Sequence, residues 1–572
     1  DDIGPSFGGA TGLENRWTIN GAPADDIKTG GVGTRLPLIF LDGIQVTAGG
    51  FSARDRTSTG GTIDAQLIGG SDHHEIQGYA WLSYNFNGRK KPIPDESYNI
   101  RTISVDLGPD VTLGLVARGP LGHVLGGTAW YAAGIAPNLS RTGFDWRAAT
   151  LVDSNDDGAA DGIPGQLATQ TVELDHRDVL SYFIPMMGRV GLDRGVHHFD
   201  LSIVGDVSHS SRFIANSTIP ASGVDRIDVV GDAIATWRAE WADTHLRVQL
   251  AWHRSYHDES ARDPAAANKP QLLSLYVPTS LPDDPKLATA CDDLGVDPFP
   301  LITNCPVPGA FFASGGAGLL TKQVGDRPSV TADVTRRLGP NTVRAGVTGE
   351  DTTLETTSRF TGNELDSSLF PQHLIQTRFI HDGNSCPDDP NIPCQYLDES
   401  VLDYRTLYGA AYIEDTWQAA PDIRVDGGLR WELMWVGTQV HFSDELSPRL
   451  GLAWDPLGGG RSRVWISMGR SYVVLPAGLG STVTGRDSTV DDTTLPQGHG
   501  RDVALGNPIT VLPGIKPMTQ DELTAGGELA VERSVKLTGW VQGRRLTDGI
   551  DTTPTGVDNP GRDGSLDAER SS

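Results

Sequence analysis

Alternating apolar and polar residues recur along much of the chain. The stretch 424–435 is the clearest case, because its apolar and charged residues separate by position, with Val425, Leu429, Trp431, Leu433 and Trp435 opposed to Arg424, Asp426, Arg430 and Glu432. Successive side chains of a β-strand point to opposite faces, so this period of two predicts a strand with one apolar and one charged face. The same separation recurs at 244–252 and 450–454.

Strand-like stretches follow one another in pairs from about residue 76 onward. Each pair is joined by a short turn, at Gly119–Gly126, Leu192–Val196, Trp241–Thr244, Leu338–Asn341, Ala419–Asp422, Pro456–Ser462 and Glu532–Ser534. Short turns between alternating stretches predict antiparallel hairpins. Together with a first strand, these hairpins predict about fifteen strands of roughly ten residues each.

Much longer connections separate one pair from the next. They run over 86–110, 137–177, 257–328, 352–403 and 473–518. In an antiparallel sheet, all of them lie at one end and the tight turns at the other. Outer-membrane β-barrels show this asymmetry, with short periplasmic turns and long extracellular loops. A soluble antiparallel sheet with one covered face explains the alternation equally well, but it does not explain the asymmetry.

A barrel in the membrane also assigns the two faces of each strand. An arginine that faces lipid at mid-membrane costs roughly 2–4 kcal/mol, so the charged face points into the lumen and the Trp- and Leu-rich face into lipid. We therefore predict an all-β fold for residues 73–572, a transmembrane antiparallel β-barrel in the outer membrane of a bacterium. The present chain holds about fifteen of the roughly 22 strands of a plugged transporter barrel.

Residues 1–72 do not continue the hairpin rhythm. They are rich in Gly and contain short apolar runs such as Leu36–Ile39 and Ile44–Thr47, which is typical of a small compact insert. Since a wide polar lumen is filled by water or by a plug, we interpret this segment as part of a plug domain.

Composition and charge narrow the function classes. The 69 Gly and 36 Pro favour turns and extended segments over helical bundles. The formal net charge of -27 repels phosphate backbones and argues against nucleic-acid binding. The sequence shows no phosphate-binding loop, nucleophile elbow or paired-histidine metalloprotease motif, so we do not expect an enzyme.

Two local patterns in the long connections predict sites that would stabilise these loops, namely disulfides and a calcium site. The four cysteines form two close pairs, Cys291 with Cys305 and Cys386 with Cys394, for which we favour disulfides; a zinc site is the alternative. Alternating oxygen side chains suggest a weak calcium site in an extracellular loop, formed by Asp153, Asn155, Asp157 and Asp161, and a solvated acidic loop is the alternative. We expect no required cofactor.

Several longer motifs together carry a family resemblance. They are Leu-Glu-Asn-Arg-Trp-Thr-Ile-Asn-Gly at 13–21, Leu-Pro-Leu-Ile-Phe-Leu-Asp-Gly-Ile-Gln-Val at 36–46, Ala-Tyr-Ile-Glu-Asp-Thr-Trp-Gln at 411–418 and Gly-Gly-Leu-Arg-Trp-Glu at 427–432. The chain resembles TonB-dependent outer-membrane receptors, and the Oar-like subgroup most closely. The departures are Arg54-Asp55-Arg56, where the family has an acidic-aromatic-Gly run before the plug arginine, and Asn20 in place of Asp.

The resemblance implies a function and a set of partners. It implies uptake of a large, unidentified extracellular ligand, energised by a TonB–ExbB–ExbD-type complex that contacts a plug segment preceding this sequence, with the closing strands following it. It also implies an ion pair in the lumen between Arg56 and Glu414 or Glu432. The alternative function is a barrel that imports nothing and serves adhesion, surface binding or protein secretion. The long connections are the expected ligand-binding loops.

Overall fold

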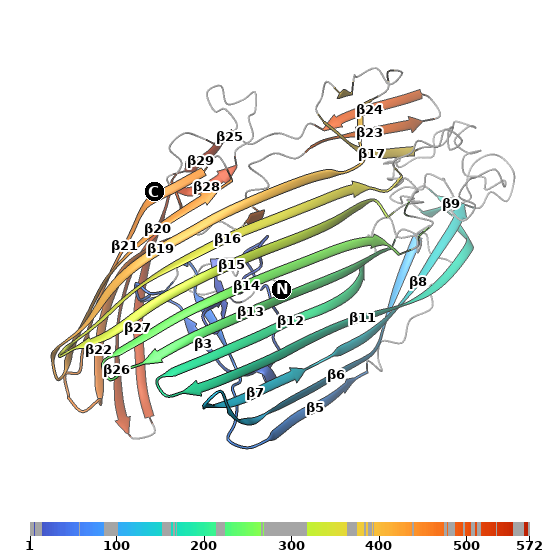
Figure 1. Ribbon diagram of the computed structural model, residues 1–572. Helices are drawn as coiled ribbons and strands as arrows, with labels where there is room; N and C mark the ends of the chain where they lie inside the picture. The colour runs from blue at the N-terminus through green and yellow to red at the C-terminus, as the bar shows by residue number, and fades with distance from the viewer. Residues whose placement is uncertain are drawn as a thin grey trace.

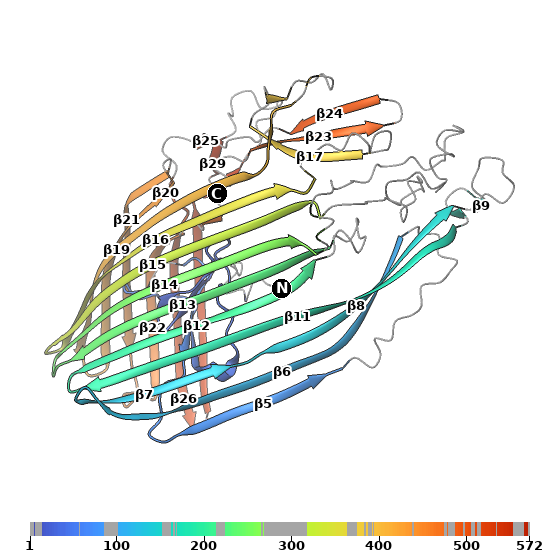
Figure 2. The ribbon, with the colours of Figure 1, turned by 45° about the vertical axis from the view of Figure 1, so that its right-hand side comes forward.

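A computed structural model of the chain shows one large curved antiparallel sheet with a small sheet on its concave side (Figures 1 and 2). The structure describes residues 5, 14–55, 58–84, 101–151, 162–163, 166–167, 169–212, 223–262, 264, 267, 317–362, 374–381, 385–386, 392, 394–437, 440–473, 477–478, 487–495, 498–504, 510–511, 516–532, 535–552 and 565–569.

Within these residues the large sheet has 16 strands, close to the predicted number. They are β5 (Glu75–Ser83), β6 (Arg101–Val124), β7 (Gly127–Ile135), β8 (Asn138–Leu151), β11 (Thr169–Arg194), β12 (His197–Arg212), β13 (Val224–Glu240), β14 (Thr244–Ala261), β15 (Leu319–Leu338), β16 (Asn341–Phe360), β19 (Ser400–Ala420), β20 (Ile423–Val436), β21 (Val440–Trp454), β22 (Ser462–Tyr472), β26 (Thr519–Glu532) and β27 (Val535–Thr547).

The order of the strands follows the chain. It runs β27-β26-β22-β21-β20-β19-β16-β15-β14-β13-β12-β11-β7-β6-β5, and β8 pairs with both β6 and β11. Each predicted tight turn is confirmed as the reversal between two paired strands, for instance between Leu338 and Asn341. These reversals gather at one end of the sheet, opposite the extra strands contributed by the long connections (Figure 1). The predicted asymmetry of the connections is therefore present.

The predicted strand length is wrong. β15 and β16 each have 20 residues and β19 has 21, because the hydrogen-bonded ladders continue beyond the roughly ten residues that cross a bilayer. Four of the predicted loops are shorter than expected, because their ends belong to barrel strands. These ends are residues 101–110 of the first loop, 138–151 and 169–177 of the second, 257–261 and 319–328 of the third, and 352–360 and 400–403 of the fourth. The connection 473–518 does lie between β22 and β26, as predicted.

The separation of side chains between the two faces is confirmed. On β20, Leu429, Trp431 and Trp435 are 44%, 40% and 46% exposed, whereas Arg430 and Glu432 are buried. On β14, Leu250 and Trp252 are exposed and Gln249 is buried. Apolar side chains thus cover the outer face and polar ones line the inner face, the inverse of a soluble protein and the pattern expected of a wall in lipid.

The small sheet is built from residues 16–67. Its order is β2-β1-β4-β3, with β1 (Arg16–Ile19), β2 (Ala22–Pro23), β3 (Leu41–Thr47) and β4 (Thr62–Leu67), and a 3-10 turn η2 (Leu38–Phe40) precedes β3. Asn20 stands in the left-handed turn between β1 and β2 with φ 51°, and its Oδ1 accepts a hydrogen bond from Leu67 N. Asn adopts this conformation more readily than most residues, which explains its place at the turn.

Two of the long connections form a separate small sheet at the end of the large sheet opposite the tight turns, which we call the open end. β17 (Leu374–Ile380), β18 (Tyr396–Leu397), β23 (Ser488–Leu495) and β24 (Gly498–Ala504) form a four-stranded sheet in the order β18-β17-β23-β24. We call it the loop sheet. Its small core contains Ile380, Cys386, Cys394 and Val490.

The remaining strands are short. They are β9 (Gly162–Ile163) and β10 (Gln166–Leu167), which pair with each other, and β25 (Thr510–Val511), β28 (Gly549–Thr552) and β29 (Ser565–Glu569), which form a three-stranded sheet. Among the residues described, no helix has the length and apolar character needed to cross a membrane.

Candidate functional site: the contact between the small sheet and the wall

The segment Ala48–Asp55, which follows β3, lies against the inner face of the large sheet, which we call the wall. Glu414 on β19 accepts hydrogen bonds from Ser52 Oγ at 2.5 Å and Ala53 N at 2.9 Å, while its other oxygen accepts one from Arg344 Nη1 at 2.8 Å. Glu414 points inward because it alternates with Ile413, which is 56% exposed on the outer face. We call residues 48–55 the wall-facing segment.

Two buried arginines bind the backbone of the same segment. Arg430 Nη1 lies 3.3 Å from the carbonyl oxygen of Ala53, and Arg449 Nη1 donates to the carbonyl oxygen of Ser52. Arg430 also pairs with Glu432 at 2.9 Å, so the buried charge is partly neutralised within its own strand. The wall therefore recognises the segment largely through main-chain atoms, with side-chain contacts at Ser52 and Arg54.

Further along the wall, strands β26 and β27 continue this pattern. Glu522 accepts a hydrogen bond from Gly50 N at 2.8 Å, and Arg544 Nη2 donates to the carbonyl oxygen of Ala48 at 2.6 Å. Arg544 and Glu522 also pair with each other at 3.0 Å. Both ends of the wall-facing segment are thus held by luminal charges.

The ion pair predicted between Arg56 and Glu414 or Glu432 stays a prediction, because Arg56 lies outside the described residues. Both glutamates face the lumen, and Glu414 binds Ser52 and Ala53, a few residues before Arg56. Sequence reasoning missed the arginines of the wall that bind carbonyl groups. Their inward alternation was a usable signal, but nothing in the sequence marks a backbone carbonyl as a partner.

A second contact is made by residues 16–36 through side chains. Asp25 Oδ2 lies 2.8 Å from Arg327 Nη1 on β15 and 3.3 Å from Arg16 Nη1, with all three residues buried. Arg35 pairs with Asp206 on β12 at 2.9 Å, and Thr34 Oγ1 donates to Asp232 on β13. The identity of these side chains determines much of the contact, and Arg327 and Arg247 also donate to the carbonyl oxygens of Asp25 and Asn20.

The wall-facing segment also contains a titratable group in an unusual setting. Burial raises the pKa of Asp55 above its ordinary value, although the hydrogen bond from Ser52 N and the nearby Arg449 act in the opposite direction. The neutral form of this carboxyl is therefore favoured in the folded segment more than in the unfolded chain.

A cavity of about 330 Å³ separates part of this segment from the wall. It is lined by Gly50–Ala53 on one side and by wall residues that include Arg449, Arg463, Trp465, Ser467 and Glu522 on the other. Its volume lies at the lower end of the range for small-molecule sites.

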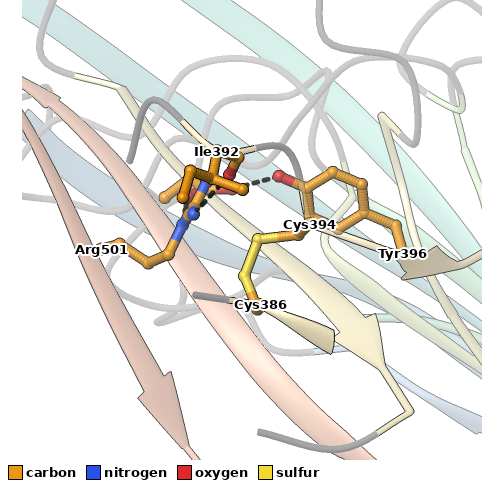
Figure 3. The surroundings of a disulfide bond; sticks show 6 residues. Cys386, Ile392, Cys394, Tyr396 and Arg501 are labelled. Carbon is orange, nitrogen blue, oxygen red and sulfur yellow. Dashed lines mark hydrogen bonds and ion pairs between the residues drawn. A yellow bond between two sulfur atoms is a disulfide. The ribbon is translucent and has the colours of Figure 1, made fainter. Parts of the chain in front are cut away.

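The loop sheet carries the predicted disulfide between Cys386 and Cys394 (Figure 3). Next to it, Asp492 accepts hydrogen bonds from Tyr396 Oη at 2.6 Å and Arg501 Nε at 2.8 Å, and Arg501 Nη1 donates to the Ile392 carbonyl at 2.9 Å. Burial, followed by the carboxylate of Asp492, raises the pKa of Tyr396 to about 12. The disulfide closes a short loop within one connection, and the hydrogen-bond network joins that connection to another one that is far away in the sequence.

The other predicted loop sites lie outside the described residues. These are the pair Cys291 and Cys305 and the calcium motif Asp153, Asn155, Asp157 and Asp161. Within the described part of the chain, no group of three or more His, Cys, Asp or Glu side chains is arranged to hold a metal ion.

The fold and the site define a class, an outer-membrane β-barrel whose lumen holds a plug sheet. Residues 222–568 match the family described as TonB dependent receptor-like, beta-barrel, which is more than half of the chain, and the chain belongs to this family. The family consists of receptors and transporters of the bacterial outer membrane, so this is where the protein is located.

A curated relative and solved structures agree with this assignment. The chain is 23% identical over 536 residues to the TonB-dependent transporter Oar of Myxococcus xanthus, covering 84% of this chain and 48% of the relative. It is similar in fold to the outer-membrane transporter YddB of Escherichia coli, with a TM-score of 0.58, 13% identity and coverage of 96% of this chain and 64% of that one. For the siderophore receptor PirA of Acinetobacter baumannii, the TM-score is 0.52 and the identity 12%, with coverage of 97% of this chain and 65% of that one. The chain thus spans about half the length of the curated relative and under two thirds of these structures.

Proposed function

We propose that the protein is a receptor that takes up a large extracellular ligand across the outer membrane, with energy from a TonB–ExbB–ExbD-type complex. Residues 1–72 act as the C-terminal part of the plug and residues 73–572 as the wall. The observation that carries the proposal is the polar contact of the wall-facing segment with Glu414, Arg430 and Arg449. Groups that leave such hydrogen bonds can bond to water instead, which limits the net cost to roughly 1.5–3 kcal/mol for each bond to a charged group, so a pulled plug can leave the wall.

The ligand would bind at the open end, where the long connections lie. Loops on a rigid scaffold commonly carry recognition, and the loop sheet offers a stapled surface there. The proposed function requires no cofactor. Outer-membrane lipid surrounds the apolar outer face, on which Trp431 and Leu450 are exposed.

Accumulation of iron-loaded siderophores in cells tests this proposal. The panel would include ferric enterobactin, and the complete receptor would be compared in cells with and without the energising complex and with a protonophore. We expect accumulation of at least one compound that requires both the receptor and the energising complex. Accumulation that depends on the receptor but is unchanged without the complex or with the protonophore would contradict energised uptake.

The loop sheet also favours a second candidate, a barrel that imports nothing and serves adhesion, surface binding or protein secretion. It has its own small core and a disulfide, so it is built to keep its shape outside the membrane. For this candidate, binding of cells to a surface or partner would persist without the energising complex. For energised uptake, accumulation would be lost while surface binding remained.

Three local features remain proposals within this function. Arg56 would pair with Glu414 or Glu432 in the lumen; Cys291 and Cys305 would form a second disulfide; and Asp153, Asn155, Asp157 and Asp161 would hold Ca²⁺ weakly in an extracellular loop. Charge reversal at Arg56 should weaken amide protection in the plug. Thiol counting in the denatured protein, and terbium luminescence of the Asp153→Asn variant against its parent, test the other two.

A further inference from the structure

The two sides of the plug differ in apolar contact with the wall, although polar side chains of the wall bind the plug on both sides, as Asp206 binds Arg35. On one side an apolar cluster joins the plug to strands β6, β7, β11, β12 and β13. Its buried plug members are Ile19, Ala22, Ala24, Phe40, Leu67 and Ile68, and its wall members are Val116, Ala132, Ala136, Met187, Val204 and Ile234. Separation of this side would expose apolar surface to water, at a cost of roughly 25 cal/mol per Å².

On the other side the wall-facing segment meets β19–β21, β26 and β27 through hydrogen bonds to charged side chains. Its half-exposed Arg54 also pairs with Asp333 on β15 at 3.5 Å, an ion pair that must break when the segment withdraws. Separation of these groups exchanges protein hydrogen bonds for bonds to water, at a net cost of roughly 1.5–3 kcal/mol for each bond to a charged group. The cavity of about 330 Å³ lies on this side, so part of the contact is already open.

The local backbone permits such a movement. The wall-facing segment lies outside the strands of the small sheet, and Gly50 has φ +64°, a conformation that glycine adopts without strain. β3 ends at Thr47, just before this segment, so the sheet can keep its pairing while the segment changes position.

From these observations we infer that the plug opens on one side. The wall-facing segment is the gate, the cavity behind it is the start of the solute passage, and residues 16–36 stay attached to β12–β15. Because Arg449, Arg463 and Glu522 line the cavity, the passage suits polar or charged solutes. This inference rests on the proposed energised function.

Two buried serines of the wall provide a matched pair of probes. Ser447 lies on β21, paired with Arg430 and two residues from Arg449, and Ser202 lies on β12; both are 0% exposed. In cells that express the complete receptor, Ser447→Cys and Ser202→Cys would each be labelled with a small charged maleimide, with and without a protonophore. The parent receptor gives the background of the native cysteines.

We expect energised cells to label Ser447→Cys several-fold faster than de-energised cells, with no change at Ser202→Cys. A faster reaction at Ser202→Cys alone, or equal increases at both positions, would overturn the one-sided gate while energised movement stands. No increase at either position would refute energised movement itself, and the gate with it.

Two disulfide locks sharpen the test. A Cβ built at Gly50 lies 3.9 Å from the Ser467 Cβ, and one at Gly325 lies 3.4 Å from the Ile27 Cβ. Both values are close to the roughly 3.5–4.5 Å of real disulfides. In the Ser447→Cys background, oxidised Gly50→Cys/Ser467→Cys should abolish the energised increase and oxidised Ile27→Cys/Gly325→Cys should leave it. The opposite result would place the gate on the other side.

Discussion

The two contacts of the plug with the wall differ in the balance of side-chain and main-chain recognition. Residues 16–36 are held mainly by side chains, as in the buried pair of Asp25 with Arg327, and by the apolar cluster around Phe40, although Arg247 also binds the Asn20 carbonyl. The wall-facing segment is held mainly by its main chain, whose amide and carbonyl groups meet Glu414, Arg430 and Arg449. Its side-chain contacts are those of Ser52 with Glu414 and Arg54 with Asp333. A contact through side chains depends on the plug sequence, whereas one through the backbone depends mainly on the wall. The same lumen can therefore hold one part of the plug firmly and another part exchangeably.

The largest effect is expected at the apolar side. Phe40 is fully buried and belongs to the cluster shared with the wall, so Phe40→Ala should lower the stability of the plug by about 3–5 kcal/mol. Hydrogen exchange of the β1 and β4 amides in the complete receptor measures this loss. Leu38→Ala, two residues away at a side chain that is 77% exposed, is the control and should change stability by less than about 0.5 kcal/mol. Equal effects of the two variants would contradict the assignment of the cluster.

The buried ion pair should give the next largest effect. Arg327→Ala removes one charged partner of the buried Asp25, and we expect a loss of about 3 kcal/mol. The triple variant Arg16→Met/Asp25→Asn/Arg327→Met removes all three charges and should recover much of the stability. Thermal unfolding of the complete receptor in detergent distinguishes the two. A triple variant less stable than Arg327→Ala would show that the charges themselves stabilise the plug.

Backbone recognition predicts an asymmetry between wall and plug variants. Glu414→Gln weakens the acceptor of Ser52 and Ala53 and should destabilise the wall-facing segment by about 2 kcal/mol, whereas Ser52→Ala removes one hydrogen bond and should cost about 1 kcal/mol. The exchange rate of the Ala53 amide reports both. If Ser52→Ala accelerated that exchange more than Glu414→Gln, the side chains of the segment would matter more than its backbone.

The smallest effect should be a pH dependence confined to the wall-facing segment. Burial raises the pKa of Asp55, so protonation is favoured in the folded segment. The stability that this carboxyl contributes is therefore present at acidic pH and is lost as pH rises through its raised pKa. Exchange of the Ser52 amide, corrected for its intrinsic pH dependence, should be slowest at acidic pH. Asp55→Asn should remove this trend, and a trend that persisted in this variant would assign it to another group.

The alternating pattern was sufficient to predict the wall. Its strict period of two placed Trp431 outside and Arg430 inside, and the tight turns at positions such as 338–341 located the hairpins. Both signals are local, because side-chain direction and turn geometry depend on neighbouring residues alone. The close spacing of Cys386 and Cys394 was likewise sufficient for one disulfide.

Other features depend on residues that are distant in the sequence. The length of β19, the pairing of β8 with β6 and β11, and the loop sheet formed by residues 374–397 and 488–504 arise from ladders between separate segments. A strand continues as long as its neighbour supplies hydrogen-bonding groups, and the sequence of one strand does not state how far the next one reaches.

The sequence by itself determined the class of fold, the two faces of the wall and the presence of charged residues in the lumen. Only the tertiary structure decided what those charges bind. Arg430 and Arg449 find backbone carbonyl groups of residues about 400 positions earlier in the chain. Every residue carries a carbonyl group, so the choice of partner is made by the position of the plug inside the barrel.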